Sequence, residues 1–354
     1  PSHRFDINLE EDLIEEVVRL IGFQNLPTTA PIAPVEPQAR SETQRSRFAV
    51  RRVLAGLGYQ ETINFSFVEE RWEKELAGNA DPIQLLNPIA SQMSVMRSSL
   101  LGSLLQVLKH NLDRKADRVR VFELGRVFVR DASVKTTDTS VAGIHQPLRV
   151  AGLAFGGAAQ RQWGVKDVAA DFFDIKGDVQ SLLAPLEATF EAAEHPAMHP
   201  GRCARLMLHG VEIGVIGELH PRWRQSYELP HAPVMFELDL GAVMGRALPS
   251  AKSLSRFQSV ERDIAVVVGP QVSYAALMQC VRGADTAGLL RNAVLFDVYA
   301  PNTPVAGMGP GEKSWALRLT LASDDATLQD AQIDAAVHNV VQALATHLGT
   351  RQRA

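Results

Sequence analysis

Cysteine is scarce in this 354-residue sequence: Cys203 and Cys280 are the only two, and no CxxC pair occurs. This shortage excludes a disulfide-rich scaffold and a structural zinc site built from several thiolates. Both cysteines are expected to be small buried side chains in a protein kept in a reducing compartment. We therefore expect a cytoplasmic location.

Long apolar runs and a strong excess of one charge are also missing. No run approaches the 18 or so apolar residues that a membrane span requires, so the sequence predicts no membrane segment. With 36 Lys and Arg against 40 Asp and Glu, the formal net charge is -4, which gives no general attraction to nucleic acid. Any contact with RNA must come from a local patch or from shape. The chain starts at Pro1 just before a predicted helix, and we expect it to be part of a longer protein.

Familiar catalytic motifs are absent as well. The sequence contains no HExxH, no GxSxG and no GxGxxG that opens a helix. The segment GMGPGEKS differs from a phosphate loop because Glu312 separates Gly311 from Lys313, and it is predicted to be a glycine-rich hairpin. Four histidines without metal-ligand spacing are predicted to be structural: His195, His199, His209 and His220. The sequence therefore predicts no catalytic centre within this chain.

The first predicted element is an amphipathic helix over residues 9–21. Its apolar residues recur at helical spacing, and Gly22 follows as a C-terminal cap. Four prolines then fall between residues 27 and 40, which excludes a helix or a central strand and predicts an extended linker. We expect residues 1–26 to belong to one domain and a second domain to begin at residue 41.

Two α+β domains are predicted after the linker. In residues 41–246, several strand-like segments separated by helical ones predict an antiparallel sheet with helices packed on one side. Residues 252–354 have the order strand, helix, strand, hairpin, strand, helix, strand, which is the ferredoxin-like β-α-β-β-α-β arrangement. Thr327 and Asp330 are predicted to form a capping box at the start of its last helix.

Carboxylates gather at the first helix. Asp12, Glu15 and Glu16 have the spacing of one helix face, and Asp6 lies just before it. Mg²⁺ prefers oxygen ligands, usually a few carboxylates with waters, so the pattern fits a magnesium site. A solvated acidic face is the alternative, because acids in a first helical turn interact favourably with the helix dipole.

Basic and aromatic residues accompany the strands of the last domain, although the domain is neutral overall. Together they predict a basic sheet face on which RNA bases could stack, and the candidates are Arg256, Arg262, Phe296, Tyr299, Lys313 and Arg318. Lys252 and Phe257 are further candidates from the same pattern. The alternative for the aromatics is a place in the core, where strand aromatics are more often found.

Three blocks of the sequence resemble the β subunit of bacterial phenylalanyl-tRNA synthetase (phenylalanine–tRNA ligase). The first is RFDINLEEDLIEEVVRLIGFQNLP. The second combines NPIASQMSVMRSSLLGSLLQVLKHN and VFELGRVF with HPGRCARLMLHGVEIGVIGELHP. The third runs from SLSRFQSVERDIAVVV to the C-terminus, where Gln258 departs from the proline common in the family. Together the blocks cover nearly the whole chain.

The resemblance implies that this chain is the C-terminal portion of that subunit. It implies the end of a central helical B5-type domain at 1–26, a linker at 27–40 and a class II synthetase-like domain without catalysis at 41–246. The last domain, 252–354, would then be the ferredoxin-fold anticodon-binding domain. Arg97, in the family's Met-Arg-x-Ser-Leu run, is predicted to be structural.

The same resemblance implies the chain's ligands and partners. Mg²⁺, shared with the α subunit, would be held by Asp6, Asp12, Glu15 and Glu16. ATP would be a substrate at the α subunit, in an α2β2 assembly that charges tRNA(Phe) with phenylalanine. The family's editing domain lies nearer its N-terminus, so this chain is not expected to edit misacylated tRNA.

Two other functions are compatible with the sequence. The chain could be a free-standing RNA-binding or scaffold module that reuses these folds, since a fold alone does not fix a function. It could also be a magnesium-dependent enzyme by itself, although the acidic helix has no neighbouring nucleophile or base in the sequence.

Overall fold

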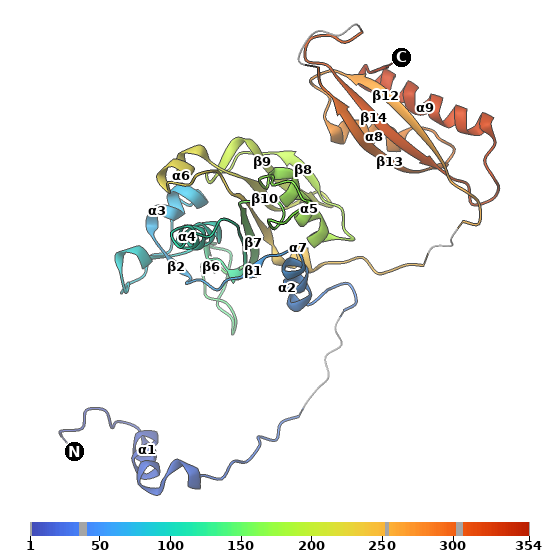
Figure 1. The fold of residues 1–354 in the computed structure, drawn as a ribbon. Helices are drawn as coiled ribbons and strands as arrows, with labels where there is room; N and C mark the ends of the chain where they lie inside the picture. Colours follow the sequence, from blue (N-terminus) through green and yellow to red (C-terminus); the bar gives the residue numbers. More distant parts are fainter. Residues whose placement is uncertain (1, 35–40, 252–254, 302–306, 354) are drawn as a thin grey trace. The chain divides into compact units, whose positions relative to one another are not determined.

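The computed structural model describes residues 2–34, 41–251, 255–301 and 307–353 (Figure 1). The chain divides into two compact units, Pro1–Ser41 and Glu42–Ala354. The second unit contains two main sheets, one of seven strands and one of four. The second unit begins at Glu42, and the second domain was predicted to begin at residue 41.

The first unit consists of helix α1 (Glu10–Ile21) and one turn of 3-10 helix, η1 (Phe23–Asn25). The predicted amphipathic helix is therefore confirmed, and it ends at Gly22, whose φ of 93° suits glycine. None of its residues is buried, so its apolar side is exposed. Of the predicted linker, residues 27–34 contain no helix or strand, and 35–40 lie outside the described residues.

The seven-stranded sheet is the centre of the second domain. Only its edge pair, β1 with β4, is parallel, and all its other neighbours pair antiparallel, as predicted. Across the sheet the strands are β1 (Gln60–Glu61), β4 (Val119–Arg126), β7 (Leu148–Phe155), β11 (Val234–Asp239), β10 (Val211–Leu219), β9 (Met198–Leu208) and β8 (Thr189–Ala192).

Helices cover both faces of this sheet, and not one face as predicted. Helices α2 (Arg47–Gly56), α5 (Phe172–Leu183) and α7 (Leu240–Met244) share an apolar core with Phe122 and Phe236. Helix α4 (Leu101–Leu112) forms a second core with Val121 and Met235, neighbours of those two residues in sequence. Because successive strand residues point to opposite faces, consecutive apolar residues in β4 and β11 require cover on both sides.

Short elements complete this domain at its periphery. Two small antiparallel pairs are β2 (Phe67–Val68) with β3 (Val95–Met96), and β5 (Val129–Arg130) with β6 (Ile144–His145). The short helices are α3 (Glu70–Trp72), the π-helical η2 (Glu73–Ala77), η3 (Ser91–Met93) and α6 (Pro221–Ser226).

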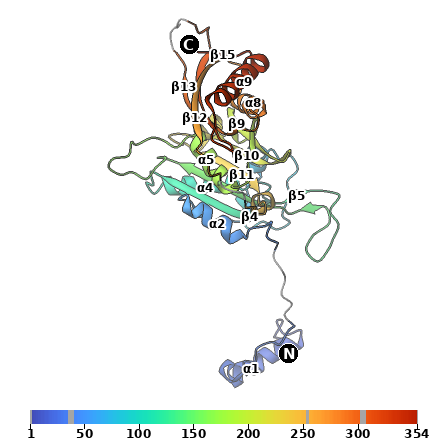
Figure 2. The same cartoon turned by 90° about the vertical axis from the view of Figure 1, so that its right-hand side faces the viewer.

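The last domain has the predicted ferredoxin-like order. Its elements are β12 (Val260–Val268), α8 (Tyr274–Gly283), β13 (Leu290–Tyr299), β14 (Lys313–Leu321), α9 (Asp330–Leu348) and β15 (Arg351–Gln352). The strand order is β13-β14-β12-β15, and α8 and α9 lie together on one side of the sheet (Figure 2). Their apolar residues form a core with Val266, Trp315 and Leu317, and none of the described helices lies over the other sheet face.

The predicted capping box at Thr327 and Asp330 is wrong. The N-cap of helix α9 is Gln329, two residues after Thr327, and the Gln332 side chain accepts the Gln329 backbone N–H at 2.9 Å. Leu328 is buried and packs in one cluster with Ile333, which fixes how the chain enters the helix. Burial of that leucine therefore sets the helix start.

Candidate RNA-binding face and acidic helix

The uncovered face of the four-stranded sheet carries Arg318 and Phe296. Leu317 and Leu319 on β14 point into the helix-covered core, so Arg318 between them lies on the opposite face. Its guanidinium group lies 5.3 Å from the centre of the Phe296 ring, and Phe296 is 51% exposed. A half-exposed aromatic ring beside a cation is therefore presented on this open face.

Asp263 on β12 holds Arg318 in this position. It accepts two hydrogen bonds, from Nε and Nη2 of Arg318, both at 2.8 Å. Hydrogen bonding to Arg318 lowers the pKa of Asp263 and raises that of the arginine. A bidentate ion pair of this kind fixes the plane of the guanidinium group, although both side chains are about half exposed.

Tyr299 and Arg353 form a second aromatic and cationic pair on this face. The Arg353 guanidinium lies 5.0 Å from the centre of the Tyr299 ring, although β13 and β15 are the two outer strands of the sheet. Between them the paired residues Ala265 and Ala316 have small side chains, which leaves room for Arg353 to reach across. Sequence reasoning missed Arg353, whose only signal was its alternation with Arg351 in the final strand.

The structure does not bring the other predicted RNA-binding residues onto this face. Arg262 pairs with Leu319, a core residue, and Lys313 precedes the core residue Trp315 by two positions, so both belong to the helix-covered side. Arg256 is exposed ahead of β12, and Lys252 lies outside the described residues. Of the six candidates, only Phe296, Tyr299 and Arg318 share the open face.

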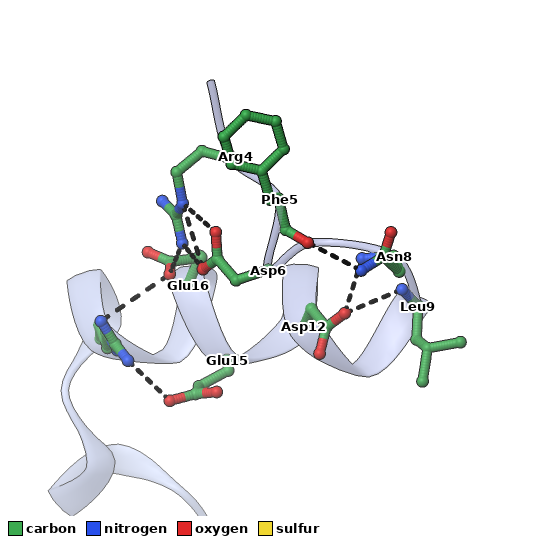
Figure 3. Close-up of polar contacts among 9 residues, drawn as sticks. Arg4, Phe5, Asp6, Asn8, Leu9, Asp12, Glu15 and Glu16 are labelled. Carbon is green, nitrogen blue, oxygen red and sulfur yellow. Dashed lines mark hydrogen bonds and ion pairs between the residues drawn. The ribbon is translucent and has the colours of Figure 1, made fainter. Parts of the chain in front are cut away.

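The predicted metal ligands at helix α1 contact different partners (Figure 3). Arg4 bridges two of them, because its Nη2 lies 2.7 Å from Asp6 Oδ2 and 2.6 Å from Glu16 Oε1. Hydrogen bonding to Arg4 lowers the pKa of Asp6 to about 2. Asp6 and Glu16 thus converge on a single cationic group even though ten residues separate them.

Asp12 and Glu15 point elsewhere. The Asp12 carboxylate accepts the backbone N–H groups of Asn8 and Leu9, at 2.8 and 2.9 Å, which satisfies donors at the helix start and lowers its pKa. Glu15 accepts a hydrogen bond from Arg19, one turn later, at 2.8 Å, and Arg19 Nη1 also lies 3.8 Å from Glu16 Oε1. Among the described residues, no group of three or more acidic, cysteine or histidine side chains is arranged to hold a metal.

Comparison with known proteins identifies the family. Residues 26–240 match the family described as "Phenylalanyl tRNA synthetase beta chain CLM domain", and residues 255–353 match "Ferredoxin-fold anticodon binding domain". The chain belongs to the phenylalanyl-tRNA synthetase β-chain family. The sequence resemblance is thereby confirmed.

Curated relatives of this β-chain family match the full length of the chain. It is 51% identical over 357 residues to the "Phenylalanine--tRNA ligase beta subunit" of Burkholderia pseudomallei, and 51% identical over 359 residues to that of Ralstonia nicotianae. The Bordetella bronchiseptica protein of the same name is 46% identical over 360 residues. All of this chain is covered in each match, but only 44 or 45% of each relative, so it spans less than half their length.

Three histidine side chains accept hydrogen bonds from the backbone within turns. His195, His199 and His220 are each followed by proline, and each Nδ1 accepts the backbone N–H two residues ahead, at 3.0 to 3.2 Å. Proline has no N–H and a fixed φ, so it favours such a turn and leaves the next N–H as the donor. The fourth histidine, His209, has a φ of 51° in the turn between β9 and β10. These roles agree with the structural assignment made from the sequence.

Side chains fill the space above the centre of the seven-stranded sheet. A Cβ atom added at Gly152 on β7 would lie 2.4 Å from the Phe236 ring, so that ring occupies the space directly over the glycine. On the other face of the sheet, Arg97 Nη2 pairs with Glu123 Oε1 at 2.7 Å, and both side chains are less than 5% exposed. Arg97 is therefore structural, as predicted.

Among the described residues, no helix is long and apolar enough to cross a membrane.

Proposed function

We propose that the chain is a supporting part of phenylalanine–tRNA ligase that binds the anticodon region of tRNA(Phe) and the α subunit. In this proposal ATP activates phenylalanine at the α subunit, within an α2β2 assembly in the cytoplasm. Membership of the β-chain family and the match to an anticodon-binding domain support the proposal. The chain would contribute binding and positioning.

The observation that carries tRNA binding is the open sheet face of the last domain. Single-stranded RNA is commonly read by unstacked bases that lie on aromatic side chains of a sheet, with cations near the backbone. Phe296 is half exposed and Tyr299 is 40% exposed, and each has an arginine at 5.0 to 5.3 Å. This arrangement fits unpaired anticodon bases better than a double helix.

The direct test is tRNA binding by the 354-residue chain after Phe296→Ala and Tyr299→Ala substitution. Loss of a base–aromatic stack costs about 1–3 kcal/mol, so each change is expected to weaken tRNA(Phe) binding at least about fivefold. Tyr274→Ala is the matched control, because Tyr274 is 50% exposed at the start of α8, on the helix side of the same domain. Equal losses for the control and the two test variants would contradict the assignment.

Binding of the α subunit is supported by exposed apolar side chains beside the small sheet β2–β3. Ile63 and Phe65 precede β2 and are 93 and 68% exposed, and Leu86 and Ile89 are 98 and 86% exposed. Arg97 fixes the segment that carries the first two, since its backbone N–H donates to Ser66 O at 2.9 Å. Large apolar side chains held outward in this way are typical of protein–protein contact sites.

Copurification tests this part of the proposal and separates it from the alternative, a free-standing RNA-binding module. Ile63→Asp and Leu86→Asp are expected to abolish copurification of a coexpressed α subunit, because each would place a charge in an apolar contact. Val141→Asp, at an exposed valine of the loop that leads into β6, is the control. Failure of the unaltered chain to retain an α subunit would favour the free-standing module.

The non-catalytic role is supported by the packing of the seven-stranded sheet, both of whose faces are covered by apolar cores. Phenylalanine activation by the isolated chain is therefore not expected. ATP–pyrophosphate exchange measures this directly: exchange by the chain alone, free of α subunit, would contradict the proposal.

Magnesium binding at α1, shared with the α subunit, is a further part of the proposal. Asp6 and Glu16 already lie within 2.7 Å of one cationic group, the Arg4 guanidinium, so a metal ion at this point would have to displace Arg4. Asp12 and Glu15 could join them only by giving up their contacts at the helix start and with Arg19.

Metal content of the αβ assembly tests this site without relying on activity. Asp6→Asn with Glu16→Gln is expected to lower bound Mg²⁺, because the two neutral side chains cannot balance its charge. Glu11→Gln, at another exposed acid of the same helix, is the control. Unchanged metal content in the double variant would refute the assignment to these carboxylates.

A further inference from the structure

The loop from Gly156 to Asp171, between β7 and α5, exposes a tryptophan almost completely. Trp163 is 95% exposed, whereas Trp223 and Trp315 are buried and Trp72 is partly buried. Gly164 follows it with a φ of 77°, a left-handed conformation that lets the chain turn directly after the indole. The loop therefore places one large aromatic ring at its tip.

Backbone pairing closes the base of this loop. Gly157 and Ala169 form an antiparallel bridge, and Ala158 donates its N–H to Val168 O at 2.8 Å. Gly156 has a φ of 91°, and a Cβ atom there would lie 2.3 Å from Asp117 O, so the chain passes tightly against the residues just before β4. The base of the loop is thus ordered like a short hairpin.

Two arginines stabilise that base: one lies in β4 and the other is the residue just before β4. Arg118 Nε donates to Gly157 O at 3.0 Å, and Arg120 Nη2 donates to Ala158 O at 3.2 Å. Arg120 is itself held by Asp178 on α5, at 2.7 Å. The tip projects from a fixed base, so its side chains meet a partner with less loss of conformational entropy than those of a free loop.

The chemistry of the tip is cationic and amide-rich. Within residues 159–166 the charged side chains are Arg161 and Lys166, on either side of Trp163. Gln160 precedes Arg161, Gln162 lies between Arg161 and Trp163, and Asp167 follows Lys166. All of these side chains are exposed. No hydrogen bond or ion pair joins Arg161 or Lys166 to any residue in the described part of the chain.

We propose that this tip is a second RNA contact, in which Trp163 stacks on an unpaired base while Arg161 and Lys166 bind the flanking phosphates. Aromatic stacking with cations along the backbone is the usual means of holding single-stranded nucleic acid. A docking site for protein would instead favour a continuous apolar patch, and here two cations and two amides surround the ring. That the RNA is tRNA(Phe) rests on the proposed function.

Fluorescence of the 354-residue chain gives a direct measurement, because Trp163 is its one fully exposed indole. Titration with a tRNA(Phe) transcript is expected to quench this fluorescence and to protect it from acrylamide, since a stacked indole is shielded from solvent. Trp163→Phe removes the signal but retains a ring, so binding measured by filter retention should be nearly unchanged.

Two substitutions separate the stacking from the charge. Trp163→Ala is expected to weaken tRNA binding about 5- to 10-fold, with Val141→Ala in another exposed loop as its control. Arg161→Gln with Lys166→Gln should reduce the slope of log K against log salt by about 1 to 2, because two phosphate contacts are lost. Lys135→Gln, an exposed cation of a different loop, should leave that slope unchanged.

The outcomes distinguish this inference from the proposed function. If Phe296→Ala weakens binding and Trp163→Ala does not, the loop contact is refuted while anticodon binding stands. If only the loop variants weaken binding, the loop contact stands and the assignment of the sheet face fails. Loss of α-subunit copurification in Trp163→Ala, with unchanged tRNA affinity, would show a protein contact and overturn the inference.

Discussion

Removal of Arg97 is expected to destabilise the domain of residues 42–246 strongly. The Arg97 and Glu123 side chains are 3 and 4% exposed and pair at 2.7 Å, and Asn64 Nδ2 donates to the other Glu123 oxygen at 2.8 Å. Arg97→Met leaves the Glu123 charge buried with only the Asn64 amide beside it. Breaking a buried pair in this way typically costs about 3–5 kcal/mol.

The paired substitution tests whether that cost arises from the unpaired charge. Arg97→Met with Glu123→Leu removes both charges, so the double variant should be more stable than the sum of the two single effects by about 2–3 kcal/mol. Arg205→Met is the control, since Arg205 and Glu191 pair at 2.9 Å with both side chains nearly half exposed. An exposed pair contributes about 0–1 kcal/mol, so this change should have little effect.

Urea unfolding provides the free energies for this cycle. The signal is Trp fluorescence in a Trp315→Phe background, which removes the buried tryptophan of the ferredoxin-like domain. The reasoning is refuted if Arg97→Met costs less than about 1 kcal/mol, or if the single effects of the cycle add without coupling.

Two further predictions concern a titration and a packing contact. NMR titration should give Asp6 a pKa of about 2. Arg4→Gln should return it towards its ordinary value of about 3.9. The Asp6 pKa is lower in the folded state than in the unfolded state. The stability from the Arg4–Asp6 pair is therefore present above the unfolded pKa and is lost as pH falls towards the folded pKa. An unchanged Asp6 pKa in Arg4→Gln would contradict the pairing. Gly152→Ala should destabilise by about 1–3 kcal/mol, because its Cβ would lie 2.4 Å from Phe236. Gly177→Ala, in α5 with no atom near the added Cβ, should be neutral or stabilising by up to about 1 kcal/mol, and equal urea midpoints for the two would refute the contact.

The sequence predicted helices and strands well where the apolar residues of a segment recur at clear helical or strand spacing. The helical spacing of apolar residues before Gly22 gave the extent of α1, and the order of the ferredoxin-like elements followed from their strand and helix patterns. The capping box failed because Leu328 is buried with Ile333, a contact that the spacing of Thr327 and Asp330 does not reveal. The second helical layer on the large sheet was missed although consecutive apolar residues in VRVF already indicated burial on both faces.

The sequence predicted the residue types of the candidate sites, but not which of those side chains lie close together in space. The helix spacing of Asp12, Glu15 and Glu16 is real, yet Asp12 binds the backbone at the helix start and Glu15 binds Arg19. Arg4, twelve residues before Glu16, draws that carboxylate towards Asp6. A spacing rule places Cα atoms on a helix face, whereas the nearest available donor decides where each carboxylate points.

By itself, the sequence determined the family of this chain, the order of its elements and the residue types available for RNA contact. Tertiary structure alone decided which of those residues share a surface. Strand residues alternate in direction, so the pairing of β14 with β12 places Arg318 beside Asp263 on the open face and Arg262 beside Leu319 on the covered one. Adjacent residues in the chain thus have opposite surroundings, because the helices α8 and α9 pack against only one face of that sheet.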